Sequence, residues 1–370
     1  MPSSDVFVDF ALLERFMADV LMRLGMSAAD ASVCADVLIT ADRQGIDSHG
    51  VSRFKPVYVD RIRAGQVDVK AVPVIVRQGP TTSVIDGRNA MGQVVSKMAM
   101  ADAISRARRF GTGMSAVRNS NHYGIAGYYV AMAANEGMIG VTGTNARPSV
   151  APTFGAEPVF GTNPLAFGLP TDEAFPFILD CATSASQRGK IEVSARLGRP
   201  VPDGWAVGRD GKILHDAEGI LKGLRTGDAS LVPLGGTGES TGGHKGYGYA
   251  TVVEILSSAL AGGAFLSGLA GLTADGKPAM LGFGHFFIAV DVAAFLDPGA
   301  FRKTAGDILR QIRASARAPG HERIYTAGEK EYLAWMERKD RGARLDPALQ
   351  KEILQLKNDF GLESFRFPFE

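Results

Sequence analysis

Residues 117–129 read VRNSNHYGIAGYY, and this stretch indicates the fold. The apolar run before it, residues 114–117, predicts a buried strand, and residues 126–135 predict a helix that ends at Gly137. A strand that ends in a polar loop and opens a helix places side chains and free N–H groups at the carboxyl edge of a sheet, where ligands bind in open α/β folds. His122, in the middle of this loop, is therefore the first candidate site residue.

Strand-like and helix-like patterns alternate on both sides of this loop. A long helix is expected over residues 92–110, a first helix ends at Gly25, and Ser27 gives a second helix a capping-box start. The chain from residue 301 onward is charged and helical in pattern. We therefore expect an α/β protein with a mixed or parallel sheet and a helical layer built from both chain ends. Further strands are expected at residues 74–76, 82–85, 139–142, 177–181 and, as the last one, 286–290.

The composition is ordinary for a globular protein, with 45% hydrophobic and 21% charged residues in a chain of 370. A net charge of +1 indicates neither a nucleic-acid nor a membrane-surface partner. Cys34 and Cys181 cannot build a disulfide framework, and residues 1–5 show no secretory signal pattern, so we expect a cytoplasmic protein. Residues 249–272 carry a single charge, at Glu254, but their serines and glycines predict a buried helix and a turn, not a membrane span.

Residues 111–116, GTGMSA, match the dinucleotide fingerprint G-x-G-x-x-A only in their letters. The fingerprint has to follow a strand and open a helix, whereas this one follows an expected helix and opens a strand. We interpret it as the turn that ends the helix. A nicotinamide cofactor, if one binds, would need a different loop.

Ser48, His49 and Arg53 form the second candidate group. Pro56 indicates a helix that begins near Ser52 and continues to residue 65, which places the imidazole of His49 and the guanidinium of Arg53 about one turn apart. Histidine exchanges protons near neutral pH, a neighbouring hydroxyl can orient its ring, and arginine can hold a carboxylate. A helix-capping serine beside a surface histidine is the structural alternative.

Several other residues have both a functional and a structural interpretation. His122 is either an acid–base or cofactor-contacting residue or a histidine that stabilises its loop. Residues 242–248, with His244 and Lys245 among glycines, predict either an anion site or a flexible turn. Asp180 can accept hydrogen bonds from ribose or cap a helix. Lys190 is either a proton relay or a surface lysine, and Cys181 is expected to be a small buried residue. The six histidines do not have the spacing of zinc ligands, so no metal is expected.

Five motifs occur in order along the chain and together resemble the malate/L-lactate dehydrogenase family that lacks a Rossmann fold. This family includes ureidoglycolate and sulfolactate dehydrogenases, diketogulonate reductase and piperideine-2-carboxylate reductases. The resemblance covers nearly the whole chain and is specific for the family but not for the substrate. The motifs are DSHGVSR at residues 47–53, NSNHYG at 119–124, GTNPLAF at 161–167, FILDCAT at 177–183 and GHKGYG at 243–248.

The resemblance implies a homodimer that binds NAD or NADP on an unusual sheet and a small anionic substrate near the subunit interface. His49 resembles the proton donor to the substrate oxygen, with Ser48 as its partner, although in the ureidoglycolate branch the histidine matching His122 has this role. Arg53 resembles the clamp on the substrate carboxylate, and Thr162 a further substrate contact. The residues that resemble cofactor contacts are His122, Tyr123, Gly124, Ile125, Ala126, Ile178, Leu179, Asp180, His244, Lys245 and, more loosely, Gly320, His321 and Glu322.

The expected activity is hydride transfer between NAD(P) and a malate- or lactate-like 2-hydroxy acid, with sulfolactate and ureidoglycolate as further options. An NADPH-dependent cyclic imine reductase is the alternative, but the imine-reducing branch has an aspartate where this chain has Lys190, so the lysine favours the hydroxy-acid dehydrogenases. A catalytically silent NAD(P)-binding regulator is a third option. The expected domains are an N-terminal helical part at 1–80, an NAD(P)-binding α/β domain at 81–298, and C-terminal helices at 299–370 that pack with the N-terminal part. The segment at 262–282, where the resemblance places a substrate lid, is short and rich in glycine.

Overall fold

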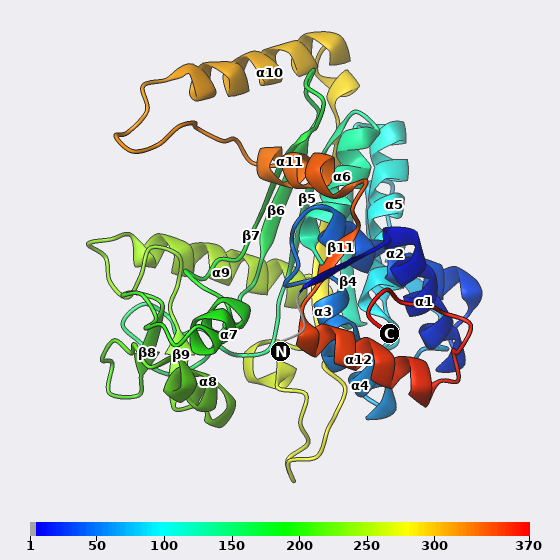
Figure 1. Ribbon diagram of the computed structural model, residues 1–370. Helices are drawn as coiled ribbons and strands as arrows, with labels where there is room; N and C mark the ends of the chain where they lie inside the picture. Colours follow the sequence, from blue (N-terminus) through cyan, green and yellow to red (C-terminus); the bar gives the residue numbers. More distant parts are fainter. Residues whose placement is uncertain (1–4) are drawn as a thin grey trace.

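The centre of the protein is a seven-stranded β-sheet, seen in a computed structural model that describes residues 5–370 (Figure 1). Residues 1–4, on which the expected absence of a secretory signal largely rests, lie outside the described residues. Strands β3 and β4 are parallel, and the other neighbouring pairs in this sheet are antiparallel. In spatial order the strands are β2 (Val74–Gln78), β3 (Thr82–Asp86), β4 (Thr112–Ser120), β10 (Phe283–Asp291), β5 (Met138–Thr144), β6 (Leu165–Leu169) and β7 (Phe177–Cys181).

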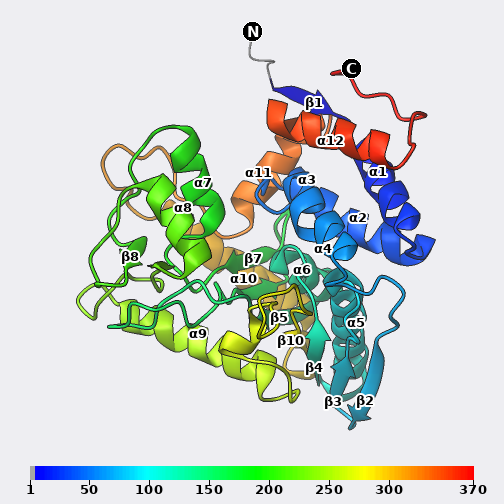
Figure 2. The same ribbon diagram turned by 90° about the horizontal axis from the view of Figure 1, so that it is seen from below.

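The mixed sheet confirms one of the two expected sheet types. Helix α5 (Gly92–Phe110) connects the parallel strands β3 and β4, and helix α6 (Ala126–Asn135) connects β4 to β5. Strand β10 lies between β4 and β5 and pairs antiparallel with both, so the sheet is not a continuous parallel array. Helices α5 and α6 cover one face, and α9 (Gly243–Ser258) covers the other (Figure 2). The loop with His122 begins where β4 ends, as expected.

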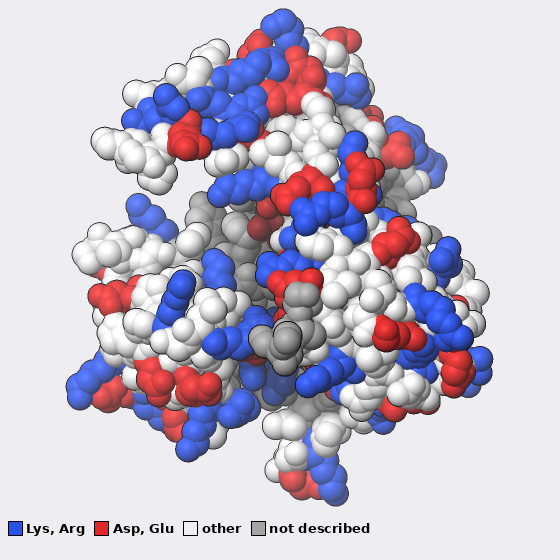
Figure 3. Space-filling model, in the orientation of Figure 1, with Lys and Arg blue, Asp and Glu red and all other residues white. Residues whose placement is uncertain are grey.

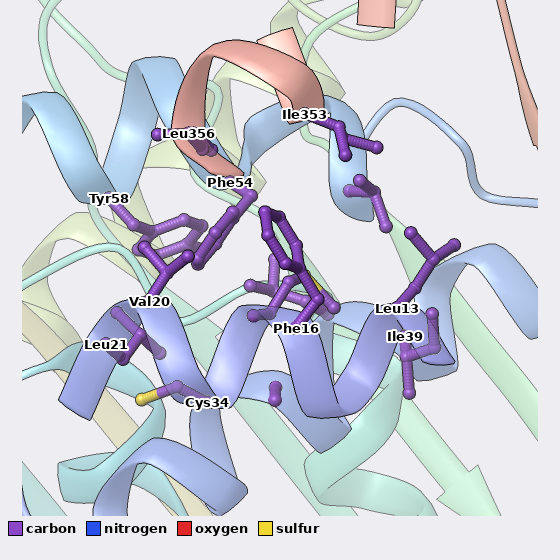
Figure 4. Packing of buried hydrophobic residues seen from close by; sticks show 14 of the residues in the cluster. Leu13, Phe16, Val20, Leu21, Cys34, Ile39, Phe54, Tyr58, Ile353 and Leu356 are labelled. Carbon is purple, nitrogen blue, oxygen red and sulfur yellow. The ribbon is translucent and has the colours of Figure 1, made fainter. Parts of the chain in front are cut away.

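The two ends of the chain pack into one hydrophobic layer beside the sheet (Figure 4). Phe16 and Phe54 from the N-terminal part lie in the same buried cluster as Ile353 and Leu356 from the C-terminal part. The expected helical layer from both chain ends is therefore present, whereas the domain boundaries stay a prediction. The layer comprises α1 (Phe10–Arg23), α2 (Ala28–Arg43), α12 (Pro347–Asp359) and the antiparallel pair of β1 (Val6–Val8) with β11 (Ala343–Leu345).

A third unit, between β7 and α9, was not expected from the sequence, which shows only turn residues over 202–227. It has its own small buried cluster, in which Ile191, Ile220 and Leu231 take part. Its short elements are α7 (Arg188–Arg196), β8 (Ala206–Gly208), α8 (Ala217–Thr226) and β9 (Ala229–Leu231).

Residues 249–272 form the end of α9, a turn and the 3₁₀ helix η2 (Leu266–Leu269), as expected in outline. The expected buried helix is buried on one side only, because Tyr249 and Ile255 on its outer side are 57% and 54% exposed. Within residues 5–370, every helix is too short or too polar to cross a membrane. The expectation that β10 is the last strand is also wrong, since β11 follows it. The remaining elements are η3 (Val292–Ala294), α10 (Pro298–Ala314) and α11 (Glu329–Arg338).

The layer made by the chain ends gives a stability prediction. Phe16 is 1% exposed and its ring meets Phe365 and Phe367 edge to face, so Phe16→Ala leaves a cavity in this layer. We expect the free energy of unfolding to fall by about 3–5 kcal/mol in urea titrations followed by circular dichroism. Met22→Ala, on the same helix but 40% exposed, is the control and should change it by no more than about 0.5 kcal/mol. Equal losses in the two variants would contradict the packing described.

Candidate active site

A buried carboxyl fixes the segment that carries His49. Asp42, which is 3% exposed, accepts a hydrogen bond from the N–H of Val51 at 2.8 Å and so sets the start of helix α3 (Val51–Arg53). Gly50 has to be glycine, because an added Cβ would lie 2.1 Å from Asp42 Oδ2. Burial raises the pKa of Asp42 to about 8. The backbone around His49 is therefore positioned by helix α2.

The helix expected over residues 52–65 is present but has a wider turn in its middle. α3 continues into the π-helix η1 (Phe54–Val59) and then into α4 (Asp60–Arg63). The π turn contains Pro56, which has no N–H to donate to the preceding turn. This segment carries Arg53 and Tyr58, both of which take part in the site.

Ser48, His49 and Arg53 are brought together as the spacing predicts. Ser48 Oγ lies 2.9 Å from His49 Nδ1, and Arg53 Nε donates to the carbonyl oxygen of Ser48 at 2.7 Å. Ser48 and Arg53 line a cavity of about 1090 Å³, whose other walls come from α7 and from residues 344–352. The Arg53 side chain thus faces open space beside the histidine.

His122 lies next to His49, so the two candidate groups form one site. The two imidazole rings are nearly parallel, with 6.1 Å between their centroids. The hydroxyl of Tyr58 lies 2.6 Å from His122 Nδ1, and the N–H of Gly124 donates to the same nitrogen at 3.3 Å. A nitrogen that accepts from an N–H carries no proton of its own, so the proton of a neutral His122 is on Nε2. His122 then offers a ligand a hydrogen-bond donor.

Both histidines are neutral at physiological pH. Burial, and secondarily the positive charge of Arg53, lower the pKa of His49 to about 4. Burial also lowers the pKa of His122 well below its usual range, and the positive charges of Arg61 and Arg53, together with that of His49 when it is protonated, act in the same direction. The site therefore holds two neutral imidazoles among cationic side chains.

His285, a third histidine of this region, was missed by the sequence analysis. It is fully buried on β10, with Nδ1 2.7 Å from Thr144 Oγ1 and Nε2 2.8 Å from Ser120 Oγ. Its ring stacks on Tyr123 with 4.8 Å between centroids. Because both ring nitrogens have partners, His285 supports the end of β4 and the loop behind the site and does not face a ligand. A single polar residue inside the apolar run of 283–290 is the signal that points to it.

The loop that follows β4 is largely buried. Tyr123, Ile125 and Ala126, three of the expected cofactor contacts, are only 2–3% exposed. Asp180 Oδ2 accepts the N–H of Gly127, in the first turn of α6, at 2.7 Å. The structure thus shows that Asp180 caps this helix, and burial raises the pKa of Asp180 to about 6.

A second cavity, of about 670 Å³, adjoins the capped end of α6. Three of the expected cofactor residues, Ile178, Leu179 and Asp180, line it together with Gly127. Its opposite wall is the segment from Tyr325 to Tyr332, which the sequence analysis missed. This segment follows the expected cofactor residues 320–322 by only a few positions in the sequence. The prediction therefore came near the residues that line the cavity but did not include them.

Other expected site residues lie apart from the two histidines. His244 and Lys245 are exposed in the first turn of α9, and Gly320, His321 and Glu322 are exposed in the loop between α10 and α11. Neither group lines either of the two cavities.

The structure also gives the surroundings of three further residues, Lys190, Thr162 and Cys181. The Nζ of Lys190 lies 5.6 Å from the centroid of Trp205, and its role as a proton relay stays a prediction. Thr162 is partly buried, and its carbonyl oxygen accepts hydrogen bonds from Thr183. The expectation that Cys181 is buried is wrong, because this residue ends the edge strand β7 and is exposed. The interpretation of Gly111 as a helix-ending turn is confirmed by its φ of 83° after α5.

Comparison with known proteins gives consistent matches over nearly the whole chain. The model of the malate/L-lactate dehydrogenase family matches residues 8–354. A malate dehydrogenase from Pyrococcus horikoshii is 41% identical over 94% of each chain, and an L-sulfolactate dehydrogenase from Methanocaldococcus jannaschii is 38% identical over 94% of this chain and 96% of its own. The crystal structure of a malate dehydrogenase from Entamoeba histolytica superposes with a TM-score of 0.94 at 44% identity, covering 99% of this chain and all of the other.

The contact between Tyr58 and His122 can be tested by titration. Tyr58→Phe removes the hydroxyl next to His122 Nδ1, and losing a donor to the neutral ring raises the pKa of His122. We expect this upward shift in NMR titrations of the histidine ring protons. Tyr128→Phe is the matched control, since the Tyr128 hydroxyl binds Asp36 at 2.6 Å and makes no contact with His122. An unchanged His122 titration in Tyr58→Phe would show that the hydroxyl does not donate to this ring.

Proposed function

The chain belongs to the malate/L-lactate dehydrogenase family, and from this membership we propose reversible hydride transfer between a small 2-hydroxy acid and a nicotinamide cofactor. The observation that carries the proposal is the neutral pair His49–His122 beside Arg53. A neutral imidazole can accept the hydroxyl proton of an alcohol, and Arg53 makes no ion pair within residues 5–370, so it is available to a carboxylate. These are the two functions that oxidation of a 2-hydroxy acid requires of the protein.

The cavity at the end of α6 supports binding of the cofactor, which supplies the hydride acceptor when bound. Its volume of about 670 Å³ is in the range of small-molecule sites. Asp180 can accept hydrogen bonds from ribose hydroxyls while its Oδ2 caps α6. We propose that Ile178, Leu179 and Asp180 hold the cofactor with the main chain of residues 122–126. Both NAD and NADP are candidates.

We propose that His49 accepts the substrate hydroxyl proton and that His122 positions the substrate oxygen. Ser48 Oγ holds Nδ1 of His49, which leaves Nε2 free to accept the substrate hydroxyl proton as the C2 hydrogen departs as hydride. His122 has Nδ1 occupied by Tyr58 and Gly124, so its Nε2–H can donate to the same substrate oxygen. Under this proposal His49 is the acid–base residue, a role that each of the two histidines resembled.

Arg53 is proposed to bind the C1 carboxylate of the substrate, in a bidentate contact that orients C2. Thr162, which lies shortly before β6, is proposed as a further substrate contact. Cyclic imine reduction is the alternative activity. The imine-reducing branch has an aspartate at the position of Lys190, whereas this chain has a lysine there, in contact with Trp205.

The activity can be tested by following NADH and NADPH oxidation with a panel of 2-keto acids and with piperideine-2-carboxylate. We expect turnover with the keto acids, and a kcat about 10²- to 10⁴-fold lower for His49→Ala, because the general acid–base group is lost. NADH affinity of that variant, measured by fluorescence, should not change. Turnover with the cyclic imine alone would favour the reductase, and cofactor binding without any turnover would favour a silent regulator.

The pH dependence follows from the lowered pKa of His49. The neutral ring accepts the proton, so hydroxy-acid oxidation is retained above this pKa and lost as pH falls through about 4. We expect kcat/KM to show no histidine inflection between pH 5 and 8, in samples whose circular dichroism confirms that they stay folded. An inflection near pH 6.5, the ordinary value for histidine, would contradict the role or the environment of His49.

A further inference from the structure

Helix α7 of the third unit forms one wall of the cavity that Ser48 and Arg53 line. The face of the protein drawn in Figure 3 is hollowed between the third unit and the layer built from both chain ends, and residues from both parts line this cavity of about 1090 Å³. Figure 2 shows α7 on the side of the third unit that is nearer to that layer. Four of the α7 residues that line the cavity recur at helical spacing, so they share one face of the helix. These residues are Gly189, Glu192, Val193 and Arg196.

The opposite side of α7 packs into the third unit itself. Ile191 is fully buried in the small cluster of this unit, and Lys190 Nζ lies 5.6 Å from the centroid of Trp205, which packs against the same cluster. Because Gly189 and Ile191 are two positions apart on a helix, they lie on nearly opposite sides of it. The third unit therefore fixes α7, and α7 presents Gly189 to the cavity.

The contact between α7 and the proposed substrate site is close at Gly189. A Cβ added to this glycine would lie 3.0 Å from Nη2 of Arg53 and 3.9 Å from the Cβ of Ser48. The first distance is shorter than an ordinary van der Waals contact. A side chain at position 189 would therefore press on the guanidinium of Arg53.

The backbone of α7 does not require a glycine at this position. Gly189 lies in the first turn of the helix, where the conformation is helical and any residue except proline is accepted in the turn's interior. Glycine is one of the poorest helix formers, so an alanine here would favour α7. The missing side chain thus weakens the helix and leaves space beside Arg53, and only the second effect can serve the site.

Arg53 is not free to move away from a larger residue. Its Nε donates to the carbonyl oxygen of Ser48 at 2.7 Å, and Ser48 Oγ in turn lies 2.9 Å from His49 Nδ1. With Nε occupied, a carboxylate that binds in a bidentate manner has to use the edge formed by Nη1 and Nη2. Nη2 is the atom beside Gly189. A side chain at position 189 would therefore either crowd this edge or break the hydrogen bond that ties Arg53 to Ser48.

We propose that Gly189 is a positioning residue for the reaction, because its missing side chain keeps the Nη1–Nη2 edge of Arg53 open to the substrate carboxylate. The inference rests on the proposed function, which takes Arg53 as the residue that binds the C1 carboxylate. The third unit then takes part in the site by setting the orientation of this guanidinium. The cofactor cavity has other lining residues, so its ligand should not sense a change at position 189.

Gly189→Ala tests the space beside Arg53. We expect KM for the keto-acid substrate to rise about 10- to 100-fold, the value of a hydrogen bond to a charged group, with a smaller change in kcat and an unchanged NADH affinity. The melting temperature should stay the same or rise by up to about 2 °C, because alanine is the better helix former. A lower melting temperature with parallel losses of kcat and NADH affinity would show a purely structural role and overturn the proposal.

Ser194→Ala is the matched control. It also replaces a poorer helix former of α7 by alanine, but Ser194 is not one of the residues that line the cavity, so KM should not change.

A double-mutant cycle shows whether position 189 acts through the guanidinium. Lysine has neither Nη1 nor Nη2, so in an Arg53→Lys background Gly189→Ala should change KM by less than about threefold. Equal effects of Gly189→Ala in the two backgrounds would show that it acts on another group, and the proposal would be wrong.

A binding measurement separates this inference from the proposed activity. Malate and NADH are both reduced and exchange no hydride, so thermal shifts with malate in the presence of NADH report binding alone. A malate-dependent shift that is kept in Ser194→Ala and reduced in Gly189→Ala supports the role of Gly189. If the wild type neither bound malate nor reduced any keto acid, the proposed function and this inference would fail together. If wild type and Gly189→Ala bound and turned over substrate equally well, the proposed function would stand and the role of Gly189 would be refuted.

Discussion

The contact between the Tyr58 hydroxyl and His122 Nδ1 is the interaction on which the site depends, because it joins two parts of the protein that have separate hydrophobic clusters. Tyr58 belongs to the cluster built from both chain ends, whereas Tyr123, next to His122, belongs to the cluster between the sheet and α5 and α6. The 2.6 Å contact aligns these parts at one point, and the N–H of Gly124, which donates to the same nitrogen, fixes the tautomer of His122. Since catalysis is sensitive to displacements of about 1 Å, a site shared by two layers needs such a link.

A second set of contacts fixes the loop that carries His49 beside the Tyr58–His122 contact. The carboxyl of Asp42 sets the start of α3, and Arg338 of helix α11 donates to the carbonyl oxygen of Asp42 at 3.0 Å. Arg338 also pairs with the carboxylate of Asp47, one residue before Ser48. The C-terminal part of the chain therefore packs against the N-terminal helices and also fixes the loop that carries the proposed base. This explains physically why the two chain ends fold into one layer.

The local part of the fold was predictable from the sequence, and the non-local part was not. Helices α5 and α6 were predicted with their observed bounds, because periodicity and a glycine at the end are local signals. Nothing local indicates that β10 inserts between β4 and β5, or that β1 pairs with β11 across the length of the chain. The same holds in the site. Ser48, His49 and Arg53 are close in sequence and were found, whereas Tyr58, His285 and the wall at Tyr325–Tyr332 act through distant contacts.

The cationic surroundings also connect substrate binding to the strength of the proposed base. In the free protein, burial and the charge of Arg53 keep the pKa of His49 near 4, which makes the ring neutral but a weak base. An anionic substrate on Arg53 cancels a charge that lowers the pKa of His49 and also that of His122. The pKa values of both rings then move upward toward the ordinary value for histidine, so the base becomes stronger when the substrate is in place. Burial, the larger cause, is unaffected by this neutralisation, so both rings stay neutral at physiological pH while the affinity of His49 for the hydroxyl proton increases.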